Sequence, residues 1–123
     1  MRIARRVSGF DEDAILMKTL SAPELAAWLA DEQRESPLLL DVREPWEVAV
    51  CRIEGSEFAP MQTIPQRLTA LKPERDTVCI CHHGGRSMHV AMFLERQGFA
   101  SVFNLAGGVD AWARQVDPAM PTY

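Results

Sequence analysis

The stretch TVCIC (Thr77–Cys81), followed at once by HHGGRS (His82–Ser87), decides the fold of this chain. A short apolar run bounded by turn-forming residues is typical of a strand that is buried within a sheet. Residues Ser87–Gln97 then show the apolar pattern of a helix, and Gly98 is a residue type that commonly ends one. The sequence therefore predicts a buried strand, a tight glycine-containing loop and a helix, in that order.

Strands and helices are expected to alternate along the rest of the chain as well. Further strands are predicted at Ile15–Leu20, Leu38–Leu40, Glu57–Phe58 and Ser101–Asn104. Further helices are predicted after two capping boxes, at Ser21–Glu24 and Thr63–Gln66, and over Glu44–Val50 and Val109–Val116. Continuous apolar runs such as Leu38–Leu40 indicate strands that are covered on both faces. This pattern predicts a three-layer α/β domain with a parallel sheet.

Length and composition favour a single domain. With 123 residues, of which 47% are hydrophobic, the chain has enough apolar material for one core. We assign this domain to residues 15–123. Residues 1–14 mix both charge signs with little apolar periodicity, which suits a mobile N-terminal arm better than a core element.

Charge and hydropathy argue against two classes of partner. The chain has 17 acidic and 13 basic residues and a formal net charge of −4, so the sequence gives no indication of a nucleic-acid partner. Arg2, Arg5 and Arg6 are not followed by the apolar segment of a secretion signal, and no stretch is long enough to span a membrane. We therefore expect neither export nor membrane insertion.

The three cysteines, Cys51, Cys79 and Cys81, are an odd number and lack the paired spacing of a zinc site. A disulfide framework or a structural metal is therefore not expected. Reduced thiols fit a cytoplasmic protein better. The sequence also gives no reason to expect a metal ion or an organic cofactor for the chemistry.

Cys81 lies at the carboxyl end of its predicted strand, where ligands bind in open α/β sheets. Gly84 and Gly85 allow the backbone to curl, so that the amides of residues 82–87 form a concave nest for an anion. The start of the following helix and Arg86 add positive charge, and such surroundings favour a reactive thiolate. Alternatively, Cys81 is a small buried residue and the glycines only form a turn. The combination of features favours a nucleophile.

The neighbouring cysteine and histidines permit other interpretations. Cys79 is more consistent with a core residue than with a resolving thiol. His82 and His83 could form a metal site with the cysteines or act as a general base. Adjacent histidines are expected to point in different directions, however, and a nest that stabilises a thiolate needs no base. His89 lies within the predicted helix and is assigned to packing or solvent.

Three segments together resemble the single-domain rhodaneses, a family of thiosulfate-type sulfurtransferases. They are DVREPWE (Asp41–Glu47), CHHGGRS (Cys81–Ser87) and LAGGVDAW (Leu105–Trp112). The resemblance covers roughly Lys18 to Tyr123. It implies a rhodanese-like domain with a central five-stranded parallel sheet flanked by helices, in which Cys81 forms a persulfide between two half-reactions.

On this resemblance, the family's nucleophile corresponds to Cys81. Its anion-binding loop corresponds to His82, His83, Gly84, Gly85, Arg86 and Ser87. Asp41 and Arg43 match positions that support the active-site region by hydrogen bonds and ion pairing. The chain departs from the family at CRIEGS (Cys51–Ser56), where members often have Gly-His-Ile-Pro-Gly-Ala. It also departs at His82, where an arginine is frequent.

The resemblance implies transfer of sulfane sulfur from thiosulfate or a related small anionic donor, through a Cys81 persulfide, to a thiol, cyanide or protein acceptor. A persulfide carrier or a partner-binding module is an alternative. A cysteine phosphatase or arsenate reductase is a weaker one. Phosphatase-type loops have five residues between cysteine and arginine, whereas only four separate Cys81 from Arg86.

Overall fold

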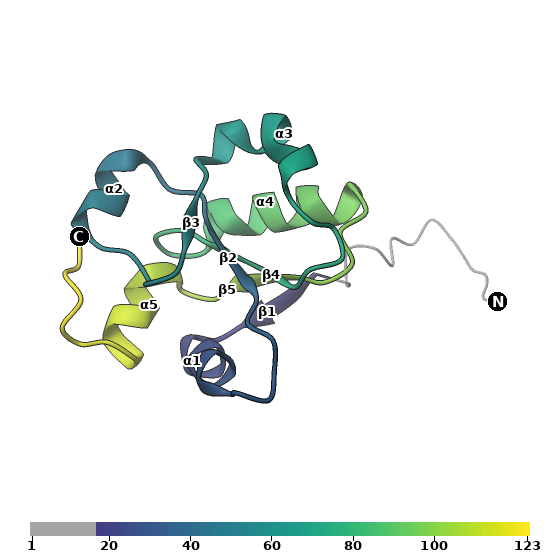
Figure 1. The fold of residues 1–123 in the computed structure, drawn as a ribbon. Coiled ribbons are helices and arrows are strands. Elements are labelled where there is room, and N and C mark those ends of the chain that lie inside the picture. The colour runs from purple at the N-terminus through teal and green to yellow at the C-terminus, as the bar shows by residue number, and fades with distance from the viewer. Residues whose placement is uncertain (1–16) are drawn as a thin grey trace.

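A computed structural model describes residues 17–123, in which strands and helices alternate along the chain (Figure 1). The strands are β1 (Lys18–Leu20), β2 (Leu38–Asp41), β3 (Glu57–Phe58), β4 (Thr77–Ile80) and β5 (Val102–Leu105). The helices are α1 (Ala22–Ala30), α2 (Pro45–Val50), α3 (Ile64–Arg67), α4 (Gly85–Arg96) and α5 (Gly108–Gln115), and the 3-10 turns η3 (Met61–Thr63) and η4 (Leu68–Ala70) flank α3. The predicted arm, residues 1–14, and the start of the predicted first strand, residues 15 and 16, lie outside the described residues.

The five strands form one parallel sheet in the order β1-β5-β4-β2-β3, which confirms the expected sheet. β4 is central, because Val78 pairs with Leu39 of β2 on one side and with Phe103 of β5 on the other. In a parallel sheet the carboxyl ends of all strands lie along the same edge. The segments that follow β2, β4 and β5 therefore meet at that edge.

Helices cover both faces of this sheet (Figure 1). On the face of α1 and α5, Val78 and Ile80 belong to a core that includes Trp28. On the face of α3 and α4, Cys79 and Cys81 belong to a second core. Because side chains of a strand alternate between the two faces, the continuous apolar run of β4 contributes to both cores. Within residues 17–123, none of the helices has the length and apolar character needed to cross a membrane.

One of the two predicted capping boxes is present. Ser21 Oγ accepts a hydrogen bond from the Glu24 amide at 3.2 Å, and the Glu24 carboxylate accepts one from the Ser21 amide at 2.8 Å. The box predicted at Thr63–Gln66 is wrong. Thr63 already belongs to η3, and its hydroxyl donates to the Pro60 carbonyl at 2.7 Å. It therefore lacks the extended backbone that a capping residue needs.

The helix after β4 begins earlier than the sequence indicated. α4 starts at Gly85, whereas the apolar pattern placed the start at Ser87. Gly84, which precedes it, has a φ of 109°, in the left-handed region that glycine adopts readily. The N-terminus of α4 therefore lies within the loop that follows Cys81.

Candidate active site

Cys81 directly follows β4 and is buried, with 1% of the residue exposed. Its sulfur accepts hydrogen bonds from the Gly84 amide at 3.1 Å and the Ser87 amide at 3.3 Å, and it lies 3.2 Å from the Ser87 hydroxyl oxygen. Both amides lie at the N-terminal end of α4, where free N–H groups carry partial positive charge. The loop therefore directs two backbone donors at one sulfur atom, an arrangement that stabilises negative charge on it.

Asn104 of β5 holds this loop in place from the neighbouring strand. Its side-chain nitrogen donates to the Gly84 carbonyl at 3.1 Å, and its side-chain oxygen accepts a hydrogen bond from the Ser87 hydroxyl at 2.5 Å. Asn104 is buried, and a buried amide without partners is unfavourable. Both groups of its side chain are thus satisfied by the residues that contact the Cys81 sulfur.

The start of α5 packs against the backbone of the same loop. The Val109 amide donates to the Cys81 carbonyl at 2.9 Å, and the Asp110 amide donates to the His82 carbonyl at 3.1 Å. Gly108 allows this close approach, because a β-carbon there would collide with the carbonyl groups of Cys81 and His82. Its φ of 59° also favours glycine. The loop is therefore fixed by the segment after β5 as well as by its own turn.

Arg86, expected to bind an anionic donor, is paired with Glu47 of α2. Its Nη1 donates to Oε1 at 2.7 Å and its Nη2 donates to Oε2 at 2.8 Å. The hydrogen bonds from Arg86 lower the pKa of Glu47 to about 2, although burial of the carboxylate opposes this. The same hydrogen bonds raise the pKa of Arg86. The Glu47 carboxylate thus already neutralises the charge of Arg86, which leaves less positive charge to attract an anionic sulfur donor.

Asp41 and Arg43, expected to support the site, form a buried ion pair at the end of β2, with 2.7 Å between Oδ2 and Nη2. Arg43 Nη1 also donates to the Tyr123 hydroxyl at 2.9 Å. Burial opposes the charged form of Arg43, but hydrogen bonds with Asp41 and Tyr123 raise its pKa. The Tyr123 hydroxyl in turn donates to Glu47 Oε2 at 3.0 Å. The Asp41–Arg43 pair is thus connected, through Tyr123, to the Glu47 carboxylate that binds Arg86.

His82 and His83 lie side by side and do not point apart as their adjacency suggested. Their ring centroids are 3.8 Å apart, with the ring planes inclined by 30°. The Tyr123 ring stacks on His82 at 3.9 Å. Burial, followed by the charge of His83, lowers the pKa of His82 below its usual 6.5, so this imidazole is mostly neutral at neutral pH. His89 is exposed on α4.

The other two cysteines lie in different surroundings. Cys79 is fully buried in the core below α4, and burial, together with the nearby Cys81, raises its pKa to about 12. Cys51 follows α2, and its sulfur lies 4.0 Å from Arg43 Nη1. All three cysteines are unpaired. Because the thiolate is the reactive form, Cys79 is unsuited to act as a nucleophile.

Four residues that the sequence analysis did not assign contribute to this region. Asn104 interrupts the apolar run of β5, and a polar residue within a buried strand is a signal for such a role. Glu47 and Asp110 lie within the motifs DVREPWE and LAGGVDAW, but nothing in their spacing identifies their partners. Tyr123 has no comparable signal, because it reaches the site through folding of the C-terminal segment.

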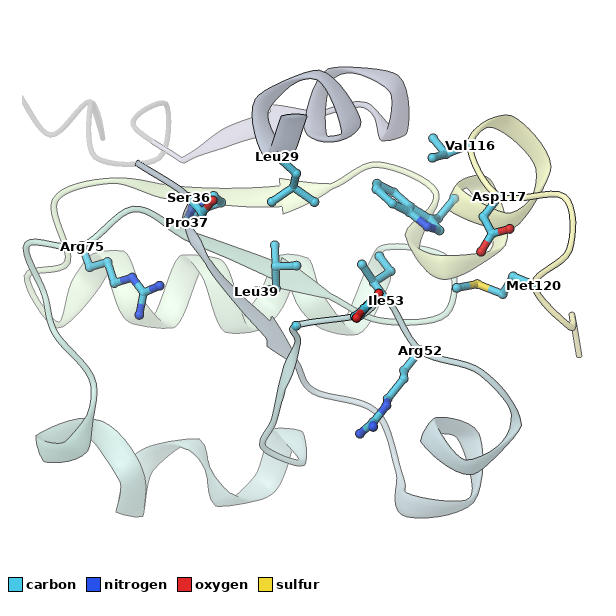
Figure 2. A pocket seen from close by; sticks show the side chains of 13 residues that line it. Leu29, Ser36, Pro37, Leu39, Arg52, Ile53, Arg75, Val116, Asp117 and Met120 are labelled. Atoms are coloured by element: carbon cyan, nitrogen blue, oxygen red, sulfur yellow. The ribbon is translucent and has the colours of Figure 1, made fainter. Parts of the chain in front are cut away.

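A separate pocket of about 770 Å³ contains none of the residues assigned to the loop. Its lining includes Leu29 of α1, Leu39 of β2 and Ile53 of the segment before β3, and also Arg52 and Arg75, which lie apart from each other (Figure 2). Leu29 and Leu39 lie on the face of the sheet that α1 and α5 cover. The pocket is therefore separated from the Cys81 loop, whose sulfur faces α4.

Comparisons with known proteins agree with this geometry. The model of the rhodanese-like domain family matches residues 21–115. The chain is 38% identical over 112 residues to the rhodanese-like/PpiC domain-containing protein 12, chloroplastic, of Arabidopsis thaliana, covering 87% of this chain but only 38% of that protein's length. It is 37% identical over 99 residues to a sulfurtransferase of Allochromatium vinosum, covering 80% of this chain and 91% of that one.

Solved structures show the same likeness. The crystal structure of a rhodanese-like domain protein from Staphylococcus aureus matches with a TM-score of 0.74 and 29% sequence identity. The match covers 87% of this chain and 99% of the other. Family match, sequence identity and architecture agree, and the chain belongs to the rhodanese-like domain family.

Proposed function

We propose that the protein is a sulfurtransferase that uses Cys81 as its nucleophile and thiosulfate as a sulfur donor. In the first half-reaction the Cys81 thiolate attacks the outer sulfur of thiosulfate, the S–S bond of thiosulfate breaks, and sulfite leaves with the bonding electron pair. The product is a Cys81 persulfide. In the second half-reaction a thiol, cyanide or a protein acceptor attacks the outer sulfur of the persulfide, and the Cys81 thiolate is released.

The observation that supports this proposal most strongly is the set of donors around the Cys81 sulfur. The backbone amides of Gly84 and Ser87 lie 3.1 and 3.3 Å from it. Donors held in place by the fold stabilise charge without reorganisation during the reaction. Because each half-reaction begins or ends with a negative sulfur at Cys81, the same donors act in both.

The surroundings of Cys81 also restrict which sulfur donors can react with it. The N-terminal end of α4 favours an anion, whereas Arg86 contributes little net charge because Glu47 neutralises it. Cys81 is 1% exposed, so a donor has to present a terminal sulfur on a slim group. Thiosulfate has both properties. The Allochromatium relative is named a sulfurtransferase, which supports sulfur transfer as the reaction class.

A free thiol such as that of Cys81 is maintained most easily in a reducing environment. Cys51, Cys79 and Cys81 are all unpaired, which is the usual state of cysteines in a cytoplasm. A cytoplasmic location therefore forms part of the proposal. Small thiols and protein thiols are plentiful acceptors there, so the second half-reaction has substrates in that compartment.

A screen of donors and acceptors with the purified chain tests this function. We expect thiosulfate and cyanide to give thiocyanate with the wild-type protein and none with Cys81→Ser, at equal folded fraction by circular dichroism. Hydrolysis of an aryl phosphate is measured in parallel. Phosphate release that disappears in Cys81→Ser, without sulfur transfer from any donor, would overturn the proposal in favour of a phosphatase.

A further inference from the structure

We infer that His82, His83 and Asp110 form a binding site for a divalent transition-metal ion, with Zn²⁺ as the best match. One ligand atom from each of the three side chains lies within 4.8 Å of the others. The two histidines come from the loop after β4, and Asp110 comes from the first turn of α5. This cluster is not predictable from the sequence, because histidines adjacent in a chain commonly diverge.

The backbone brings the three side chains together before any ion binds. The Asp110 amide donates to the His82 carbonyl at 3.1 Å, and the Val109 amide donates to the Cys81 carbonyl at 2.9 Å. Gly108 allows this contact, since any β-carbon at that position would collide with the loop carbonyls. The helix that holds the carboxylate is therefore fixed to the peptide that holds the first histidine.

The two histidine rings lie close together, with centroids 3.8 Å apart and planes inclined by 30°. An imidazole binds a metal through a nitrogen lone pair in the plane of its ring, so the exposed His83 ring has to turn for both histidines to bind one ion. The Nε2 atom of His82 is buried and has no hydrogen-bond partner among the described residues. A buried polar atom without a partner is unfavourable, and a bound cation would satisfy it.

The chemistry of the three groups selects the class of ion. Two imidazoles and one carboxylate suit zinc and similar first-row metals, whereas magnesium and calcium prefer oxygen ligands alone. Three protein ligands leave a coordination position open for water or another small ligand. Arg114 donates to Asp110 Oδ2 at 2.9 Å, the kind of outer contact that orients a ligating carboxylate.

The site is separate from the Cys81 thiol. The Cys81 sulfur already accepts hydrogen bonds from Gly84 and Ser87 on the side of α4. It is not one of the atoms in the cluster of His82, His83 and Asp110. Zn²⁺ is therefore expected to bind even when the Cys81 thiol is removed, unlike zinc that is bound by a reactive cysteine.

Metal titration of the purified, chelator-treated chain tests the inference without any assay of sulfur transfer. Calorimetry measures Zn²⁺ binding, and Co²⁺ provides a visible spectrum that reports its ligands. The decisive variant is His83→Ala, because His83 is exposed and its loss leaves the core intact. Asp110→Asn removes the carboxylate charge. His89→Ala is the matched control, since this exposed histidine lies outside the cluster.

We expect one Zn²⁺ per chain. The affinity for Zn²⁺ should be about 100-fold weaker in His83→Ala and in Asp110→Asn, because loss of a ligand costs at least as much affinity as loss of a residue that only orients a ligand. His89→Ala and Cys81→Ser should bind as the wild type does, and bound Co²⁺ should show no thiolate charge-transfer band. Absence of Zn²⁺ binding, equal binding in His83→Ala, or loss of binding in Cys81→Ser would overturn the inference. None of these outcomes depends on the proposed sulfur transfer.

Discussion

Arg86 and Glu47 join the loop after β4 to the helix α2 through two parallel hydrogen bonds of 2.7 and 2.8 Å. The Glu47 side chain is 4% exposed, whereas that of Arg86 is 37% exposed. Glu47 Oε1 also accepts the Glu44 amide at 2.9 Å, and its Oε2 accepts the Tyr123 hydroxyl. The carboxylate therefore connects the loop after Cys81, the start of α2 and the C-terminal segment.

Replacement of Glu47 by glutamine is expected to destabilise the protein by about 2 kcal/mol, because it breaks a partly buried charge pair and leaves Arg86 without its counter-charge. Urea denaturation measures the loss. Glu54→Gln is the control, because Glu54 is exposed. Equal stability of the Glu47 variant and the wild type would show that the pair does not hold the loop.

The same pair predicts a pH dependence of stability. The folded pKa of Glu47, about 2, lies below its ordinary value of 4.5, so on acidification the unfolded chain takes up this proton first. The stabilisation by Glu47 is therefore complete above pH 4.5 and is lost as the pH falls towards 2. The stability difference between wild type and Glu47→Gln should shrink over this range. A difference that stays constant would contradict the assignment.

Asn104→Leu is expected to slow sulfur transfer about tenfold. This effect is smaller than the roughly 100-fold loss of rate that follows removal of a group that donates directly to a reacting anion. The substitution keeps the approximate volume but removes the bonds to the Gly84 carbonyl and the Ser87 hydroxyl. Ser87→Ala, which removes a group that contacts the Cys81 sulfur, should slow transfer more. Rates per folded molecule are compared by steady-state kinetics. An unchanged rate in Asn104→Leu would exclude a positioning role.

Cys79→Ser is expected to lower stability by about 1–3 kcal/mol while sulfur transfer per folded molecule is retained. Cys79 is fully buried among apolar side chains, so the serine hydroxyl would lack a partner. Denaturant unfolding and steady-state rates provide the two measurements, and Cys79→Ala is the apolar control. Loss of sulfur transfer in the alanine variant at full folding would assign a chemical role to Cys79.

The local features of the fold could be predicted from the sequence. The apolar runs of β2 and β4, the capping box at Ser21 and the loop after Cys81 depend on residues that are close in the chain. The limits of α4 were less certain, since a glycine in the left-handed region moved its start into the loop. Short-range patterns thus identified these elements and the glycine-containing loop after Cys81.

The contacts that complete the site could not be predicted in this way. Glu47 and Arg86, or Asn104 and Ser87, come from different elements, and their meeting depends on strand order and register. The close approach of the His82 and His83 rings depends on how the start of α5 packs against the loop. Such contacts result from tertiary packing, which a single sequence does not specify residue by residue.

Mass spectrometry after treatment with thiosulfate tests the proposed chemistry most directly. A tryptic cut at Arg75 and Arg86 leaves Cys79 and Cys81 in one peptide, so fragmentation between them, or the Cys79→Ser variant, locates the added sulfur. We predict a gain of one sulfur atom on Cys81, which disappears after addition of cyanide. An unmodified Cys81 under these conditions, or a sulfur found on Cys79, would contradict the assignment of Cys81 as the nucleophile.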